Sequence, residues 1–240
     1  MNYIFDELSL FLPCYNEEGN LQSTFDKTLP IIQKVAKKWE IIIVDDGSKD
    51  NTGKIALNIQ KEFPQNIQIV THHPNRGYGA AFKSGFYTAK YQWITFIDAD
   101  GQFDFNDIFS LRETQKRTNA DMVIGHYLGR KVSSVRIVGT KIWQLAVFVL
   151  FGLKVTDIDC GFKLVSKKVI DTIPKLEAER GPFISSEFLI KSKHAGFKIV
   201  ESGVHHYPRK AGTATGSKIN VVISGLKDLL RLWYKLNFTK

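Results

Sequence analysis

The sequence has few of the features that mark secreted, membrane-spanning or repetitive proteins. Its 240 residues include two cysteines, Cys14 and Cys160, which are too few for a disulfide framework and lack metal-site spacing. No repeat or low-complexity stretch occurs, and the first residues, MNYIFDELSL, lack the basic start and apolar run of a secretory signal. These absences favour a folded protein in a reducing, cytoplasmic compartment.

Long hydrophobic runs are also missing. The longest apolar stretch, residues 142–153 (IWQLAVFVLFGL), is shorter than the roughly 20 residues that cross a bilayer. Arg136 and Lys141 precede it, and Lys154 follows it. The stretch is therefore expected to form either a buried helix or a helix lying at a membrane interface.

Positive charge is in excess, with 33 Lys and Arg against 24 Asp and Glu, a formal net charge of +9. Solubility alone accounts for such a charge, but the charge would also attract an anionic partner. Helix-turn-helix, zinc-finger and aromatic RNA-binding signatures are missing, so nucleic acid is not an expected partner. A diphosphate substrate or an anionic membrane surface fits the charge better.

The first half of the chain alternates apolar strands with helices. Strands are expected at 8–12 (ended by Pro13), 40–44, 67–70 and 93–97, and helices at 20–38, 52–63 and 79–90. The second half is less regular, with strands expected at 121–125, 160–165 and 198–200 and helices at 185–195 and 218–238. Continuously apolar strands separated by helices indicate an α/β protein with a mostly parallel sheet covered on both faces.

No linker rich in proline or glycine divides the chain. We expect one domain over residues 1–217, followed by a C-terminal amphipathic helix over residues 218–240. The cations of this helix lie beside its apolar stripe and are Lys218, Lys227, Arg231 and Lys235. Such a helix either packs on the domain or lies on a membrane, with its cations at anionic head groups.

Polar motifs follow three of the expected strands, at residues 13–18 (PCYNEE), 45–48 (DDGS) and 98–102 (DADGQ). In a parallel sheet, ligands bind beyond the carboxyl ends of the strands, so these motifs should meet at one edge. The carboxylates at 45–48 suit hydrogen bonding to a ribose or a base.

The third motif suits a divalent metal. Asp98 and Asp100 are carboxylates one residue apart, and Gln102 can add a neutral oxygen. Mg²⁺ and Mn²⁺ prefer oxygen ligands and keep positions for phosphate. A cation here would hold a diphosphate and neutralise the charge that builds on it as a bond breaks.

Four ordered motifs resemble those of the family 2 glycosyltransferases: PCYNEE at 13–18, VDDGSKDNT at 44–52, NRGYGAAFKSG at 75–85 and DADGQF at 98–103. More narrowly, they are similar to the polyprenyl-phosphate sugar transferases, the dolichyl-phosphate mannose synthase group and its bacterial relatives. The resemblance covers roughly residues 8–218. It implies a GT-A fold, which is Rossmann-like, a nucleotide diphosphate sugar donor, Mg²⁺ or Mn²⁺, and inversion at the anomeric carbon.

The resemblance also implies roles for individual residues. The nucleotide pocket would be lined by Pro13, Tyr15, Glu17, Val44 and Asp46. Asp98 and Ala99 would contact the donor, and Asp100 and Gln102, together with Asp98, would hold the metal.

The second half resembles the family less closely. Arg130 and Arg136 are phosphate-binding candidates, and residues 205–218 resemble an arm that closes over the diphosphate with Arg209 and Lys218. Gly125-His126-Tyr127 stands where relatives often have Gly-X-Arg, so no role is assigned to it. The residues expected to be catalytic are Asp98, Asp100, Arg136 and Arg209.

These observations predict an enzyme that moves a hexose onto a polyprenyl (dolichyl or undecaprenyl) phosphate, peripheral at the cytoplasmic face of a membrane. A phosphate acceptor is already anionic, so positioning and charge neutralisation would do most of the work. One alternative, a transferase acting on a sugar hydroxyl, would need a base such as Asp159 or Glu187. Another is a nucleotide-sugar-binding protein without turnover. A dinucleotide-dependent oxidoreductase would need a G-x-G-x-x-G turn, which is missing after the first strand.

Overall fold

The computed structural model describes residues 3–129, 134–179, 183–209 and 219–238, and within these the side chains outside 134–138 and 219–224. The strands are β1 Phe5–Cys14, β2 Ala36–Asp45, β3 Ile67–Thr71, β4 Trp93–Phe96, β5 Met122–Leu128, β6 Lys163–Ser166 and β7 Ile199–His205. The helices are α1 Leu21–Val35, α2 Thr52–Glu62, α3 Tyr78–Thr88, the 3₁₀ turn η1 Phe105–Asp107, α4 Ile108–Thr118, α5 Ser134–Phe151, α6 Lys167–Thr172, α7 Phe183–His194 and α8 Ile219–Phe238.

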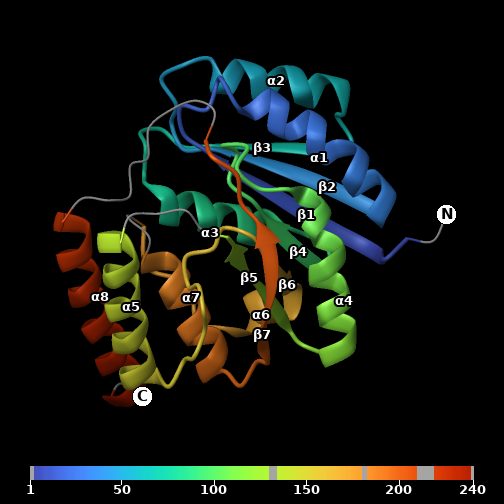
Figure 1. Ribbon diagram of the computed structural model, residues 1–240. Coiled ribbons are helices and arrows are strands. Elements are labelled where there is room, and N and C mark those ends of the chain that lie inside the picture. Colours follow the sequence, from blue (N-terminus) through green and yellow to red (C-terminus); the bar gives the residue numbers. More distant parts are fainter. Residues whose placement is uncertain (1–2, 130–133, 180–182, 210–218, 239–240) are drawn as a thin grey trace.

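The strands form one seven-stranded sheet in the order β3-β2-β1-β4-β6-β5-β7 (Figure 1). β6 is antiparallel to both of its neighbours, and the other pairs are parallel. The parallel strands therefore all end at one edge, and β6 starts from that edge. The mostly parallel α/β fold that the sequence predicted is confirmed.

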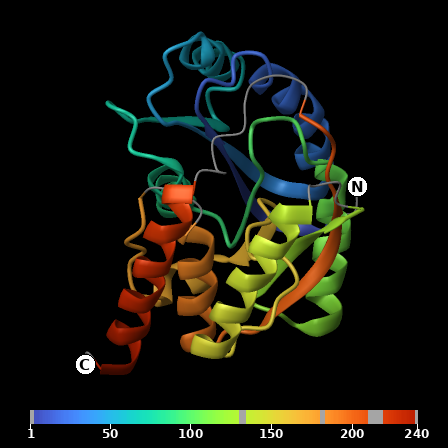
Figure 2. The ribbon, with the colours of Figure 1, turned by 60° about the vertical axis from the view of Figure 1, so that its left-hand side comes forward.

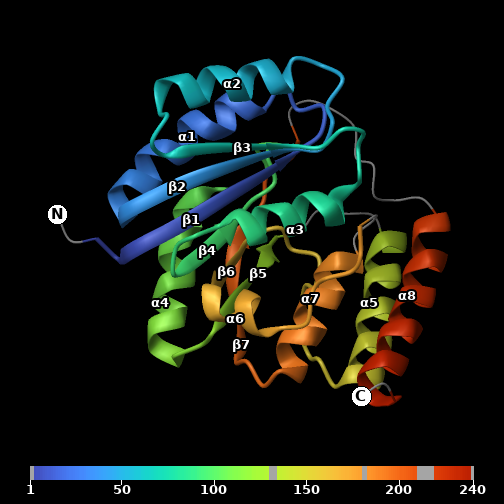
Figure 3. The ribbon, with the colours of Figure 1, turned by 180° about the vertical axis from the view of Figure 1, so that it is seen from behind.

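Helices cover both faces of the sheet (Figures 1 and 3). On one face, α1 and α2 pack against β1, β2 and β3, with Phe25 of α1 buried, and α4 packs against β5, β6 and β7. On the other face, α3 packs Phe82 and Phe86 around Phe11 of β1 and Phe96 of β4. Full burial of one such ring contributes about 1.5–3 kcal/mol, so this cluster strongly favours the observed packing of α3.

Two expected boundaries in the first half were wrong. β1 continues through Pro13, whose Cα pairs with Val44 of β2, while the β4 partner ends at Phe11. Because β1 has no β4 partner beyond Phe11, the proline, which lacks an N–H, removes no hydrogen bond between β1 and β4. The first helix ends at Val35, and β2 starts at the next residue because β1 already extends back to Phe5 and pairs with Ala36.

The apolar stretch at 142–153 lies in α5, which is a half-buried helix. Val147 is fully buried, whereas Ile142 is 64% and Val149 70% exposed. α8 packs against α5 where Gly225 meets Trp143, and Figure 2 shows both helices with α7 on one side of the sheet.

α8 likewise buries one side, with Leu229 and Leu232 inside, and exposes Leu230 and Tyr234. Within the described residues, no helix combines the length and the apolar content needed to cross a bilayer. The boundary near residue 217 between a domain and a C-terminal helix stays a prediction.

Candidate functional site

The site lies at the edge of the sheet where the parallel strands end, and its centre is the segment after β4. Asp98 is half-buried, and its Oδ1 accepts a hydrogen bond of 3.1 Å from the hydroxyl of Tyr78, the first residue of α3. Burial, followed by the charge of Asp100, raises the pKa of Asp98 to about 7. A carboxyl with so perturbed a pKa is typical of functional sites that bind cations or protons.

The segment that precedes β6 lies against Asp98. A β-carbon added at Gly161 would be 2.7 Å from Asp98 Oδ2, so a side chain at this position would displace the carboxylate. Behind it, Lys163 is fully buried, with its Nζ 5.4 Å from the centroid of the Phe96 ring and bound to the Cys160 carbonyl. Burial lowers the pKa of Lys163, while nearby thiol and carboxyl groups oppose this shift.

Asp100 joins three separate parts of the chain. Its Oδ1 accepts from the Gln102 backbone N–H at 3.1 Å, and its Oδ2 accepts from Arg209 Nη2 at 2.6 Å. Arg209 Nη1 lies 3.5 Å from Glu17 Oε1, which brings the end of β1 to the same place. Charge-assisted hydrogen bonds of this kind are roughly twice as strong as those between neutral groups.

The segment after β7 crosses the segment after β4. Tyr207 N–H donates to the Gln102 carbonyl at 2.7 Å, and Gln102 Nε2 donates to the Tyr207 carbonyl at 2.8 Å. His206 and Phe103 form an antiparallel bridge beside these bonds. This pairing brings Arg209 close to Asp100.

Asp46 at the end of β2 is surrounded by donors. Its oxygens accept from Asn75 Nδ2 at 2.7 Å, from Arg76 N–H at 3.0 Å and from Gly77 N–H at 2.7 Å. His72 Nδ1 is 2.6 Å from the same carboxylate. The carboxylate of Asp46 thus holds the turn that leads into α3, and its expected contact with the nucleotide stays a prediction.

The remaining residues expected at the nucleotide lie at the ends of β1 and β2. Pro13 and Val44 are buried and paired in register, so they can present only backbone atoms to a nucleotide. Tyr15 is 39% exposed at the surface of the site. Ala99 is buried, and its carbonyl accepts from Thr24 of α1 at 3.1 Å.

The structure does not describe the side chains of three expected site residues. Arg130 and Lys218 lie outside the described residues, and Arg136 lies in α5 with an undescribed side chain. Their expected roles stay predictions.

Glu187 does not fit the role of general base that transfer to a sugar hydroxyl would require. Its side chain is 2% exposed and paired with Lys191 at 2.6 Å, so neither a substrate hydroxyl nor water can reach it. Asp159, the other candidate, is exposed just before Cys160. The site also includes residues that motif spacing did not single out, above all Tyr78 and the buried Lys163.

The donor set fits a divalent cation. Asp98 and Asp100 lie near each other beside Arg209, and the pKa of Asp98 is raised first by burial and then by the charge of Asp100. Among the described residues, no three His, Cys, Asp or Glu side chains form a metal cluster, so Gln102, phosphate or water oxygens would have to complete the shell.

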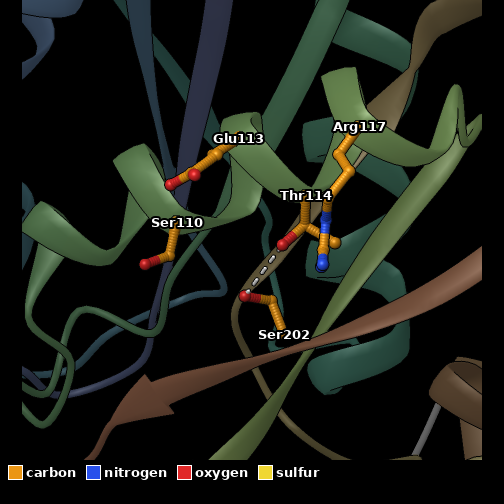
Figure 4. A pocket seen from close by; sticks show the side chains of 5 residues that line it. All are labelled: Ser110, Glu113, Thr114, Arg117 and Ser202. Atoms are coloured by element: carbon orange, nitrogen blue, oxygen red, sulfur yellow. Dashed lines mark hydrogen bonds between the residues drawn. The ribbon is translucent and has the colours of Figure 1, made fainter.

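A separate hollow of about 260 Å³ lies between α4 and β7 (Figure 4). Ser110, Glu113, Thr114 and Arg117 line it from α4, and Ser202 lines it from β7. None of the expected site residues takes part, so this hollow is distinct from the acidic edge.

Comparison with known proteins agrees with this geometry. The model of the family described as glycosyl transferase family 2 matches residues 9–173. A dolichyl-phosphate beta-glucosyltransferase of Trichomonas vaginalis is 30% identical, over 94% of this chain and 72% of that protein. The corresponding enzyme of Saccharomyces cerevisiae is 32% identical, over 92% and 71%.

Bacterial relatives and solved structures extend the comparison. An undecaprenyl-phosphate 4-deoxy-4-formamido-L-arabinose transferase of Pseudomonas fluorescens is 29% identical, over 93% of this chain and 63% of that protein. Glucosyl-3-phosphoglycerate synthase from Mycobacterium tuberculosis, solved with Mn²⁺ and UDP-glucose, has a TM-score of 0.70 at 16% identity, over 96% and 79% of the two chains. At that identity the structural likeness shows the shared fold alone.

Proposed function

Since the chain belongs to glycosyltransferase family 2, we propose that it transfers a sugar from a nucleotide diphosphate to a polyprenyl phosphate, with inversion at the anomeric carbon. The observation that carries the proposal is the meeting of Asp98, Asp100 and Arg209 at one edge of the sheet. Carboxylates suited to a metal-bound diphosphate stand there beside a cation suited to phosphate. The dolichyl- and undecaprenyl-phosphate transferases that resemble the chain support this acceptor class.

The chemistry that this site would perform needs little proton transfer. A phosphate oxygen of the acceptor attacks the anomeric carbon, while the bond from that carbon to the leaving diphosphate breaks. Because the acceptor is ionised near neutral pH, no strong base is required. Arg209 would orient a phosphate through its planar guanidinium and stabilise the charge that develops.

A divalent metal is part of the proposal. Asp98, Asp100 and Gln102 would hold Mg²⁺ or Mn²⁺, which when bound neutralises the leaving diphosphate. The closeness of the Asp98 and Asp100 carboxylates, whose charges interact, supports this ligand set. The fold neighbour solved with Mn²⁺ and UDP-glucose is a further precedent.

We propose glucose rather than mannose as the transferred hexose. The similarity expected from the motifs was to mannose synthases, whereas the relatives reported above are named for glucose or for 4-deoxy-4-formamido-L-arabinose. A uridine nucleotide is the corresponding donor, since the fold neighbour with UDP-glucose carries that base.

We further propose that α5 and α8 lie on an anionic membrane surface. The exposed apolar side chains of these two packed helices are Ile142, Leu145, Phe148, Val149, Leu226, Leu230, Tyr234 and Phe238. Lys141, Lys227 and Arg231 stand beside them on the same helices. Apolar area flanked by cations favours the boundary between acyl chains and anionic head groups, where a polyprenyl phosphate also presents its phosphate.

The proposal also includes the side of the membrane. Cys14 and Cys160 are both free and buried, as suits a reducing environment, and we propose the cytoplasmic face.

One experiment tests the reaction and the sugar together. Purified protein is incubated with Mn²⁺, a short polyprenyl phosphate and either UDP-glucose or GDP-mannose, and the products are identified by mass spectrometry. We expect a polyprenyl-phosphate hexose from UDP-glucose, and none when Asp100 is replaced by Asn. Donor that is bound but never consumed would favour the binding protein without turnover instead.

A further inference from the structure

Residues 174–179, between α6 and α7, form neither helix nor strand, yet their backbone is held at several points by side chains. Lys191 Nζ donates to the Lys175 carbonyl at 2.6 Å, and the Leu176 N–H donates to the Tyr87 hydroxyl at 3.0 Å. Because a loop has no hydrogen-bonded ladder of its own, side chains of this kind decide its conformation.

Glu187 of α7 holds two successive backbone amides of this loop. Its Oε1 accepts from the Glu177 N–H and its Oε2 from the Ala178 N–H, both at 2.8 Å. Lys191 donates to the same carboxylate at 2.6 Å, and both side chains of this pair are at most 3% exposed. The buried carboxylate therefore has a single orientation, set by two backbone donors and one cation.

The loop in turn presses against the start of α3. The Ala80 N–H donates to the Glu179 carbonyl at 3.1 Å and is shared with the Gly77 carbonyl at 2.9 Å. A β-carbon at Gly79 would lie only 2.7 Å from the Ala178 carbonyl oxygen, so glycine is needed for this approach. The Glu179 carboxylate also binds Arg76 Nη2 at 2.8 Å and Lys83 Nζ at 3.3 Å.

The start of α3 is part of the candidate active site. Tyr78, one residue before Gly79, donates to Asp98 at 3.1 Å, and the turn at Arg76 is bound to Asp46. A continuous set of contacts thus runs from Glu187 through the loop to two carboxylates at the strand ends.

We propose that Glu187 is a positioning residue for sugar transfer: through residues 175–179 it fixes the start of α3, and with it Tyr78 and Arg76, at the donor site. The inference rests on the proposed function for its kinetic test, but not for its structural test. Small displacements at a distance from the reacting atoms can cost about a hundredfold in rate.

The first test compares Glu187→Gln with wild type. Gln keeps the size of the side chain but turns an NH₂ group toward groups that are themselves donors. We expect kcat/KM for the donor to fall about ten- to a hundredfold, with the affinity for free UDP within about twofold of wild type. Hydrogen exchange of the Ala80 amide should also become faster.

A second variant avoids the buried pair, in case Glu187→Gln does not fold. Glu179→Gln removes the exposed contact to Arg76 and Lys83, and should lower kcat/KM in the same direction. The control is Asp171→Asn in α6, shortly before the loop, whose exposed carboxylate pairs with Lys167 at 3.0 Å. It should leave both the rate and the Ala80 exchange unchanged.

Each outcome decides between the alternatives. The inference is overturned if Glu179→Gln and a folded Glu187→Gln both keep wild-type kcat/KM and wild-type exchange at Ala80. It is also overturned if Asp171→Asn loses as much as they do. If the wild type itself transfers no sugar, the proposed function fails, and the exchange at Ala80 still tests the positioning role.

Discussion

Arg209 and Asp100, 109 positions apart in the chain, form a 2.6 Å hydrogen bond between Nη2 and Oδ2. Asp100 belongs to the segment after β4, and Arg209 to the segment after β7. The bond places the cation expected for phosphate beside a carboxylate expected for the metal, which defines one site for a diphosphate.

Replacing Asp100 by Asn should abolish most of the activity. The change removes one metal-binding charge and the anionic partner of Arg209, and we expect kcat to fall about 10²- to 10³-fold. Steady-state rates with saturating Mn²⁺ measure this, and circular dichroism checks the fold. Wild-type turnover in a folded variant would show that the metal site lies elsewhere.

Arg209→Ala should separate catalysis from nucleoside binding. Because Arg209 would act on phosphate charge that grows in the transition state, kcat should fall about a hundredfold while the affinity for free uridine barely changes. Arg117→Ala, which removes an arginine from the hollow between α4 and β7, is the control and should change neither kcat nor the uridine affinity. An equal loss of rate and of uridine affinity in Arg209→Ala would move its role to the nucleoside.

Much of the site could be predicted because local sequence determines it. The motifs at 13–18, 45–48 and 98–102 follow strongly apolar strands, and parallel strands bring their ends together. The contacts between these motifs and distant segments could not be predicted. The hydrogen bonds from Tyr78 to Asp98 and from Arg209 to Asp100 join residues far apart in the chain, and residue spacing does not indicate either bond.

Parts of the fold were missed for identifiable reasons. α4 was not expected, because its apolar residues cluster in its first turn, and it buries Thr114 and Gln115 further along. The start of β2 was assigned to a helix, since Lys37 and Lys38 fit a solvent-facing helix as well as a strand. The pair Glu187 and Lys191 has the spacing of a surface pair on a helix, yet α7 is buried nearly all round.

Membrane binding should depend on the exposed apolar side of α8. We expect the protein to float with anionic liposomes at about 0.05 M salt and to dissociate as salt rises toward about 0.5 M. Replacing Leu230 and Tyr234 by Ser should reduce flotation at every salt concentration. Leu57→Ser on α2, also an exposed leucine, is the control. Flotation that is equal in both variants, or absent in the wild type at low salt, would contradict the membrane assignment.

His205 should add a pH-dependent contribution to stability. Its Nδ1 is 2.9 Å from Asp107 Oδ1, and the hydrogen bond that it donates to Asp107 raises the pKa of His205 above its usual 6.5. A raised histidine pKa stabilises the fold below the unfolded-state pKa, and this gain is lost as pH rises through the folded-state pKa. The stability difference between wild type and His205→Asn should therefore shrink from about pH 6 to about pH 8. Urea unfolding at both pH values measures it, with Asp107→Asn as the second arm of a double-mutant cycle. A difference that grows with pH would contradict the ion pair.

The choice of acceptor tests most directly whether the protein transfers the sugar to a phosphate. Wild-type protein is given UDP-glucose, Mn²⁺ and an equimolar mixture of a short polyprenyl phosphate and the matching polyprenol, and mass spectrometry follows both acceptors over time. We predict that only the phosphate is glycosylated, because Arg209 can orient an anionic nucleophile, which needs no strong base. Glucosylation of the polyprenol, with the phosphate left unreacted, would contradict it.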